Sequence, residues 1–117
     1  MKACPIKEIS KCAADAGIPF LVIGGYAVLA YGYTRMTDDL DLIVQRGRRE
    51  RWGKLFEEFG MTVKNDAVTF LQLDSKDDKT MGVDLMFVSE AAFDLMSRTA
   101  MELTVAGVSA RWYRCCI

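Results

Sequence analysis

The sequence predicts an α/β (α+β) domain in which helices flank one mixed β-sheet. Two observations lead to this class: short apolar runs typical of buried strands alternate with longer segments of helical periodicity, and glycines separate several of them. No repeat or linker divides the 117 residues, of which 51% are hydrophobic. Because chains of this length usually form one core, we expect residues 1–117 to form a single domain.

The first elements follow from apolar spacing. Apolar residues recur at helical intervals over 5–16, which predicts a helix, and Gly17 suits its C-terminal end. The wholly apolar run at 20–23 predicts a strand buried on both faces. After a Gly-Gly pair, residues 26–31 are expected to be helical, and the alternation at 39–44 predicts a second strand.

The middle of the chain continues the alternation. Apolar residues at positions i, i+3, i+4 and i+7 predict a helix over 47–59, which Gly60 ends. Strands are expected at 61–64 and 68–73, a polar loop at 74–80, and a third strand of this group at 83–88.

The C-terminal part is expected to form a helix and a hairpin. Ser89 suits the N-cap of a helix that runs to about Arg98, and 102–114 is expected to turn back on itself near a Gly. Trp112 and Tyr113 could belong to the core, to a base-stacking surface, or to a homodimer contact through this hairpin.

The composition excludes several classes of function. The chain has no His, which excludes His-based catalytic triads and zinc sites that contain His. It has neither a P-loop nor a G-x-G-x-x-G motif. The formal charge of −1 provides no overall field for nucleic acid or an anionic membrane. The four cysteines do not resemble a disulfide framework, and no export or membrane segment is visible, so we expect a cytoplasmic protein with reduced thiols.

Three aspartates form the most informative pattern. Alternate residues of a strand share a face, so Asp39 and Asp41 project together while their apolar neighbours face the other way. Asp84 stands inside an otherwise apolar strand, where an acid without a partner is costly to bury. If the two strands are neighbours, the three carboxylates suit a pair of Mg²⁺ ions of the kind used in nucleotidyl transfer. Solvated strand ends are the alternative that the spacing leaves open.

A glycine pair precedes the acidic strand. Gly24 and Gly25 lie between a predicted strand and a predicted helix, where the backbone can approach a phosphate and the helix N-terminus can bind it. Ordinary tight turns use the same pair. The glycines therefore favour a phosphate site only in combination with the acids.

This combination forms one composite motif, Gly24-Gly25-Tyr26-Ala27-Val28, then Gly32, then Arg35-x-Thr37-x-Asp39-x-Asp41-Leu42. The motif resembles that of minimal nucleotidyltransferases of the DNA polymerase beta-like superfamily. The Arg-x-Thr-x-Asp part looks most like the small bacterial group that contains abortive-infection toxin nucleotidyltransferases, as in toxin-antitoxin systems. The resemblance covers roughly residues 18–90 and implies a nucleotidyltransferase-like fold.

The resemblance also implies roles for these residues. Asp39 and Asp41 would bind the Mg²⁺ ions that hold a nucleoside triphosphate such as ATP, and Asp84 would complete the second metal site and act on an acceptor hydroxyl. Gly24 and Gly25 would contact the triphosphate. The motif positions Arg35 and Thr37 would brace the acidic strand or touch phosphate. The implied reaction moves a nucleoside monophosphate to an acceptor and releases pyrophosphate.

Two other functions stay open at this point. Relatives usually continue into a C-terminal helical extension, which this sequence lacks, and so the chain could instead be a truncated, non-catalytic module for nucleotide binding or oligomerisation. The cluster of basic residues from Arg46 to Lys54 could contact RNA, although a solvated helix face is favoured. Asp74, Asp77 and Asp78 lack the spacing of a calcium loop and are expected to be solvated.

Overall fold

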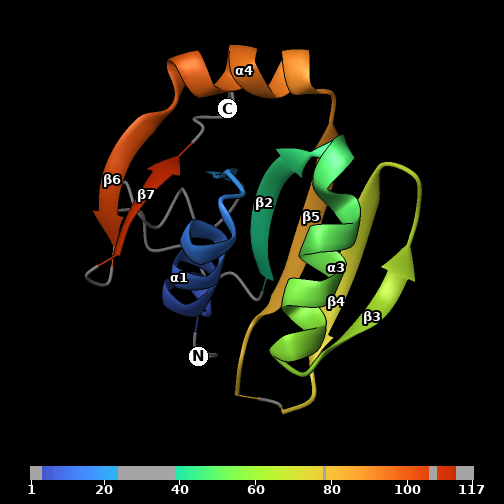
Figure 1. Ribbon diagram of the computed structural model, residues 1–117. Coiled ribbons are helices and arrows are strands. Elements are labelled where there is room, and N and C mark those ends of the chain that lie inside the picture. Colours follow the sequence, from blue (N-terminus) through green and yellow to red (C-terminus); the bar gives the residue numbers. More distant parts are fainter. Residues whose placement is uncertain (1–3, 24–38, 78, 106–107, 113–117) are drawn as a thin grey trace.

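The computed structural model of the chain describes residues 4–23, 39–77, 79–105 and 108–112. The elements follow the predicted order (Figure 1), except that the helix expected at 26–31 lies outside the described residues. In chain order they are α1 (Ile6–Ala16), β1 (Phe20–Ile23), β2 (Asp39–Gln45), η1 (Arg46–Arg48), α3 (Arg49–Glu58), β3 (Met61–Asp66), β4 (Phe70–Ser75), β5 (Gly82–Val88), α4 (Glu90–Thr99), β6 (Met101–Val105) and β7 (Val108–Trp112).

In the described part of the chain, the strands form one seven-stranded sheet in the order β3-β4-β5-β2-β1-β7-β6. The pairs β2–β5 and β1–β7 are parallel, whereas the other neighbours are antiparallel. The sheet is therefore mixed, which confirms the predicted fold class. Strand β2 is central, between β1 and β5, so its side chains lie where both faces of the sheet can be covered.

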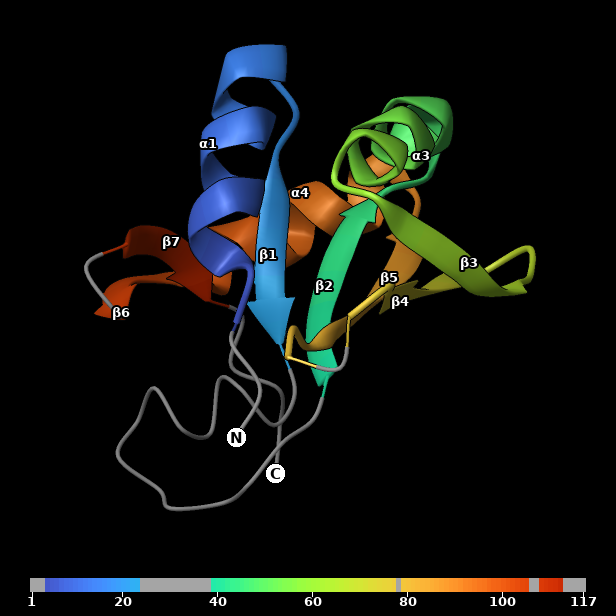
Figure 2. The ribbon, with the colours of Figure 1, turned by 90° about the horizontal axis from the view of Figure 1, so that it is seen from below.

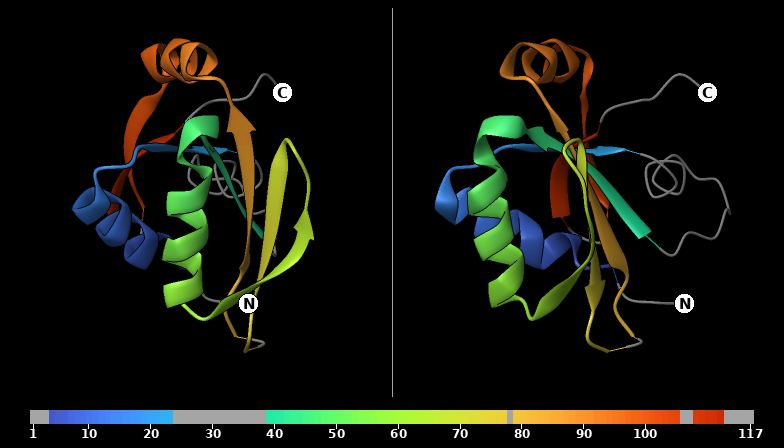
Figure 3. Two further views of the ribbon diagram at one scale, coloured as in Figure 1. Left: turned by 45° about the vertical axis from the view of Figure 1, so that its right-hand side comes forward. Right: turned by 90° about the vertical axis from the view of Figure 1, so that its right-hand side faces the viewer.

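Helices α1 and α3 cover the same face of the sheet (Figures 2 and 3), which we call the helical face. The core beneath them contains Ile9 of α1 and Trp52 and Phe56 of α3, all fully buried. Helix α4 packs on the other face, near the end of the sheet at which β5 finishes (Figure 1). There Phe93 packs against Leu21 and Ile43.

The helix ends form as the sequence predicts. Gly17 has φ 70° and follows α1, and Gly60, with φ 74°, follows α3. Glycine suits both positions because this left-handed conformation strains other residues. At the start of α4, the Ser89 Oγ accepts a hydrogen bond of 3.1 Å from the Ala92 backbone N–H, which confirms the expected cap.

The predicted bounds of β3 and β4 are wrong, since β3 continues to Asp66 and β4 is shifted by two residues from the expected range 68–73. Strand β4 runs from Phe70 to Ser75, so the polar loop expected at 74–80 is shorter and Asp74 belongs to a strand. The β3–β4 turn, at residues 67–69, is closed by a 3.0 Å hydrogen bond from the Ala67 N–H to the Phe70 carbonyl. None of the helices in the described part of the chain is long and apolar enough to cross a membrane.

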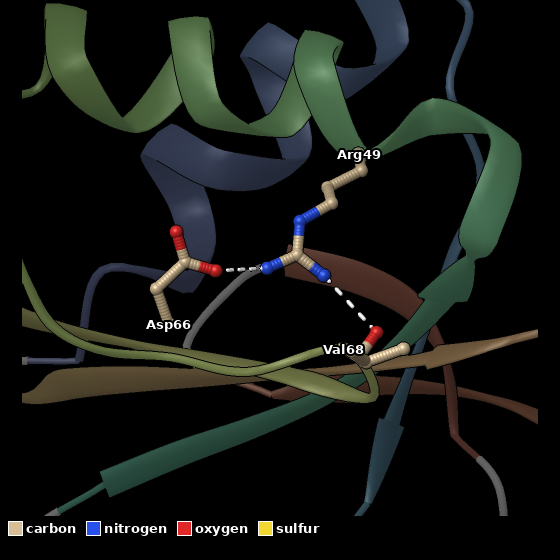
Figure 4. Close-up of polar contacts among 3 residues, drawn as sticks. All are labelled: Arg49, Asp66 and Val68. Carbon is tan, nitrogen blue, oxygen red and sulfur yellow. Dashed lines mark hydrogen bonds and ion pairs between the residues drawn. The ribbon is translucent and has the colours of Figure 1, made fainter.

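Part of the basic cluster stabilises the fold. The Arg49 guanidinium forms an ion pair with Asp66 and donates a hydrogen bond of 3.1 Å to the Val68 carbonyl (Figure 4), and it lies 4.5 Å from the centre of the Phe87 ring. Arg51 donates a hydrogen bond of 3.1 Å to the Ala16 carbonyl at the end of α1. These arginines therefore connect α3 to the β3–β4 turn and to α1.

Candidate active site

Strand β2 separates apolar and acidic side chains as its alternation predicts. Leu40 and Leu42 are fully buried in the core of the helical face. Asp39 and Asp41 project to the opposite face, where Asp39 is exposed and Asp41 is half-buried. We call this second face the acidic face.

Strand β5 adds the third aspartate to the acidic face. In the parallel ladder, Asp84 is the register partner of Asp41, and Gly82 is the partner of Asp39. Register partners on neighbouring strands project to the same side, so the three carboxylates share one surface. Asp84 is half-buried there, between the fully buried Val83 and Leu85.

Gly82 leaves room for the Asp39 side chain. A Cβ at position 82 would lie 2.9 Å from the Asp39 Oδ1, 3.2 Å from the Asp74 Oδ1 and 3.0 Å from the Leu73 carbonyl oxygen. Distances this short mean that any larger residue would displace its neighbours. The glycine therefore lets two carboxylates approach the backbone of β5.

Burial and the neighbouring acids together raise the pKa of Asp41, and burial raises that of Asp84. Burial is the largest cause that raises the pKa of Asp41 from its usual 3.8 to about 7, and the hydrogen bond to Asp84 and the charges of Asp84 and Asp39 add to it. Burial also raises the pKa of Asp84. Hydrogen bonds from Asp41 and Gln72, and the positive charge of Lys64, act on Asp84 in the opposite direction. Asp41 therefore gains and loses its proton near neutral pH, and a bound cation would favour loss of that proton.

The carboxylates suit Mg²⁺ by their donor chemistry, since this ion prefers oxygen ligands. Within the described ranges, no group of three or more His, Cys, Asp or Glu side chains already surrounds a metal position. Proteins usually bind Mg²⁺ through one or two carboxylates, with water and substrate phosphates as the other ligands. Asp39 and Asp41, with Asp84 beside them, are the described residues that could hold the ion in this way.

Sequence reasoning missed the polar residues on β4. Gln72 is the register partner of Asp84, and Asp74 follows on the same face. The sequence predicts Asp74 in a solvated loop, but β4 continues through it to Ser75. The alternation of Gln72 and Asp74 with Leu71 and Leu73 is the signal that could have extended the strand. Asp77, in contrast, is a turn residue, and backbone hydrogen bonds from Lys79 and Thr80 lower its pKa.

Several predicted site residues cannot be placed. Gly24, Gly25, Arg35 and Thr37 lie outside the described residues, as do the adjacent cysteines near the C-terminus. Two hollows on the helical side involve residues of α1, α3 and the β4–β5 connection, and neither includes Asp39, Asp41 or Asp84. They are therefore separate from the acidic site.

Comparison with solved structures shows the same fold in nucleotidyltransferases. The antibiotic-resistance factor ANT(2'')-Ia matches with a TM-score of 0.72 and 22% identity over 92% of this chain. The lincosamide antibiotic adenylyltransferase LnuA, solved with lincomycin bound, matches with a TM-score of 0.72 and 11% identity over 92% of this chain and 77% of its own. A candidate nucleotidyltransferase from Thermotoga maritima (TM1012) matches with a TM-score of 0.67 and 12% identity over 93% of this chain and 74% of its own.

The match to ANT(2'')-Ia covers 62% of that protein, so this chain spans less than two thirds of its length. No curated protein matches the sequence. The family model for aminoglycoside-2''-adenylyltransferase, however, matches residues 5–109, which include all three aspartates of the acidic face. With the nucleotidyltransferase fold and this match over most of its length, the chain belongs to the aminoglycoside-2''-adenylyltransferase family of the nucleotidyltransferase superfamily.

Proposed function

We propose that this chain is a Mg²⁺-dependent nucleotidyltransferase domain that transfers a nucleoside monophosphate, preferably from ATP, to a hydroxyl group of an acceptor. The observation that supports this most directly is the parallel pairing of β2 and β5, which brings Asp84 opposite Asp41 and beside Asp39. Carboxylates on neighbouring strands are the arrangement that in-line nucleotidyl transfer uses. The family match supports the same reaction class.

The residues have distinct proposed roles. Asp39 and Asp41 would hold Mg²⁺, two ions in the full complex, and the metal would neutralise the charge of the triphosphate. Asp84 accepts the proton of the acceptor hydroxyl. The acceptor oxygen then forms a bond to the α-phosphorus, the bond from that phosphorus to the bridging oxygen of the β-phosphate breaks, and pyrophosphate leaves. By the motif resemblance, Gly24 and Gly25 contact the triphosphate.

The acidic face favours an acceptor that carries amines. Asp39, Asp41, Asp84 and Asp74 project from neighbouring strands, and such an excess of one sign of charge attracts the opposite sign. Aminoglycosides are polyamines with hydroxyl groups, and the family match names them as acceptors. We therefore propose an amine-bearing antibiotic as the acceptor, and the cytoplasm, where nucleoside triphosphates are available, as the location.

Other acceptors have less support. An RNA acceptor would need free basic groups, yet Arg49 and Arg51 are engaged in contacts within the fold. A toxin-type activity, expected from the Arg-x-Thr-x-Asp part of the motif, stays a prediction because Arg35 and Thr37 lie outside the described residues. A homodimer through the β6–β7 hairpin also stays a prediction.

Calorimetry and product analysis test the proposed function. We expect at least one of ATP, GTP, CTP and UTP to bind in the presence of Mg²⁺, and chelation of the metal to abolish binding. Incubation with ATP and tobramycin, the compound found adenylylated in complex with ANT(2'')-Ia, should give a product heavier by one adenylyl group. Mass spectrometry detects this product directly, and lincomycin provides an acceptor of another class.

A matched pair of double variants provides the control. Asp39→Asn with Asp41→Asn should abolish Mg²⁺-dependent nucleotide binding. Asp15→Asn with Asp94→Asn removes the same charge from exposed positions on α1 and α4 and should leave binding intact. Absence of triphosphate binding in the unmodified protein, or equal binding by both variants, would contradict the proposal. Binding without product from any acceptor would favour the non-catalytic alternative.

A further inference from the structure

Four polar side chains form a row across the acidic face. Asn65 on β3 is the register partner of Gln72 on β4, Gln72 is the partner of Asp84 on β5, and Asp84 is the partner of Asp41 on β2. Such partners lie directly opposite each other on neighbouring strands, with side chains close enough to interact. The row therefore runs at right angles to the strands and ends at the proposed catalytic carboxylates.

The amide groups in this row have a defined direction. The Asn65 Nδ2 donates a hydrogen bond to the Gln72 Oε1. A glutamine amide has one acceptor oxygen and one donor nitrogen, so this contact turns the Gln72 Nε2 away from Asn65. Asp84, the register partner of Gln72 on β5, lies on that side, and hydrogen bonding from Gln72 lowers the pKa of Asp84. The Gln72 amide is thus oriented by Asn65.

We propose that Gln72 is a positioning residue for Asp84 and that Asn65 acts through Gln72. The proposal rests on the proposed function of Asp84 as the group that accepts the proton of the acceptor hydroxyl. The Gln72 amide occupies one oxygen of the Asp84 carboxylate and fixes the plane of the group. The other oxygen is then directed toward Asp41 and the reacting hydroxyl.

A purely structural role makes different predictions from a positioning role. Polar partners on adjacent strands also stabilise a sheet, and loss of such a contact would lower stability while the turnover of the folded protein stayed the same. Loss of a group that orients a catalytic carboxylate lowers turnover by about 10- to 100-fold, as is typical for residues that support a metal or catalytic site. Turnover of the folded protein therefore separates the two roles.

Kinetics of three variants test the positioning role. We expect Gln72→Leu to lower kcat by about 10- to 100-fold, with KM for ATP almost unchanged, because the nucleotide ligands remain. Gln72→Glu keeps the size but replaces the donor by a negative charge, so it should not rescue activity. Asn65→Ala should have a smaller effect than Gln72→Leu, and it should have no further effect when Gln72→Leu is already present.

Gln45 provides a matched control. It lies at the end of β2, is half-buried like Gln72, and is the register partner of Val88, away from the acids. Gln45→Leu makes the same chemical change as Gln72→Leu and should leave kcat unchanged. Equal kcat in Gln72→Leu and the unmodified enzyme, or equal losses in the two Gln→Leu variants, would overturn the proposal.

A second measurement does not depend on activity. The side-chain amide signals of Gln72 in a ¹H–¹⁵N spectrum should move in both Asp84→Asn and Asn65→Ala, whereas those of Gln45 should stay in place. If the Gln72 signals keep their positions in both variants, the proposal is overturned whatever the kinetics show. If the signals move but the unmodified protein forms no product, the proposed function fails and the orienting contact stands.

Discussion

The two faces of β2 show how one strand serves two purposes. On the helical face, Leu40 and Leu42 are fully buried beneath α1 and α3. On the acidic face, Asp39 and Asp41 lie close to a further carboxylate, and burial together with these neighbouring acids raises the pKa of Asp41 to about 7. The first face supplies the hydrophobic stabilisation that allows the second to hold mutually repelling charges. Substitutions of neighbouring residues should therefore separate stability from activity.

The largest expected effect is on activity, at Asp41. We expect Asp41→Asn to lower kcat on the order of a thousandfold, about 4 kcal/mol, because it removes a proposed metal ligand. The free energy of unfolding at pH 8 should not fall, since the lost charge was repelled by Asp39 and Asp84. Steady-state kinetics and urea denaturation of the same preparation measure both quantities. Lower stability at unchanged kcat would contradict the division between the two faces.

The next effect is on stability, at the adjacent residue. Leu42 is fully buried in the core of the helical face. Leu42→Ala should lower the free energy of unfolding by about 3 kcal/mol, because it removes buried methyl groups and leaves a cavity. The proposed activity for each folded molecule should stay close to that of the unmodified protein. Denaturant titration tests the first statement, and kinetics at low temperature, corrected for the folded fraction, test the second.

Several features of this molecule can be predicted from short stretches of its sequence. The alternation in β2, the apolar stripe of α3 around Trp52 and Phe56, and the glycine and serine ends of the helices are short-range signals, and the structure has them as expected. The pairing of β2 with β5 is different because about forty residues separate the strands. Two acids in one strand and one in another suggested the pairing, but only the fold shows Asp84 opposite Asp41.

Other parts of the site could not be predicted from local patterns. A single Gln in a strand carries no signal of its own, and the role of Gln72 depends on its register with Asp84 and Asn65. The contacts of Arg49 depend on the β3–β4 turn, which lies far from it in the sequence. Register and long-range contacts follow from the packing of the whole sheet, whereas periodicity reports only one element.

A smaller effect concerns the pH dependence of stability. The pKa of Asp41 is raised from 3.8 to about 7 in the folded protein, so between these values the folded state binds a proton that the unfolded state has lost. The free energy of unfolding should therefore fall as the pH rises from about 4 to 7 and then level off. Allowing for solvent screening of a half-exposed group, we expect a change on the order of 1 kcal/mol.

Urea denaturation at pH 4.5, 5.5, 6.5 and 7.5 measures this slope. The sequence contains no His, so few other groups titrate in the upper part of this range. Asp41→Asn should flatten most of the curve, and Mg²⁺ should restore stability at pH 7.5 by neutralising the carboxylates. A slope that survives in Asp41→Asn would assign the pH dependence to other groups.

The smallest effect tests polar contacts on the helical side, where no chemistry is proposed. The ion pair between Arg49 and Asp66 is largely solvent-exposed, and such pairs contribute little. Asp66→Asn should therefore lower the free energy of unfolding by about 0.5 kcal/mol. Arg49→Ala should cost about 1 kcal/mol, because it also removes the hydrogen bond to Val68 and the contact with the Phe87 ring.

Arg49→Lys distinguishes the parts of this contact. Lysine keeps the positive charge but cannot reproduce the planar, two-sided contact in which one guanidinium binds Asp66 and Val68 (Figure 4). The free energy of unfolding of Arg49→Lys should lie between the values for the unmodified protein and for Arg49→Ala. The kcat should be the same in all three proteins. A loss of kcat in Arg49→Lys without loss of stability would mean that the guanidinium contacts on the helical side affect the acidic site, and the functional separation of the two faces would then be wrong.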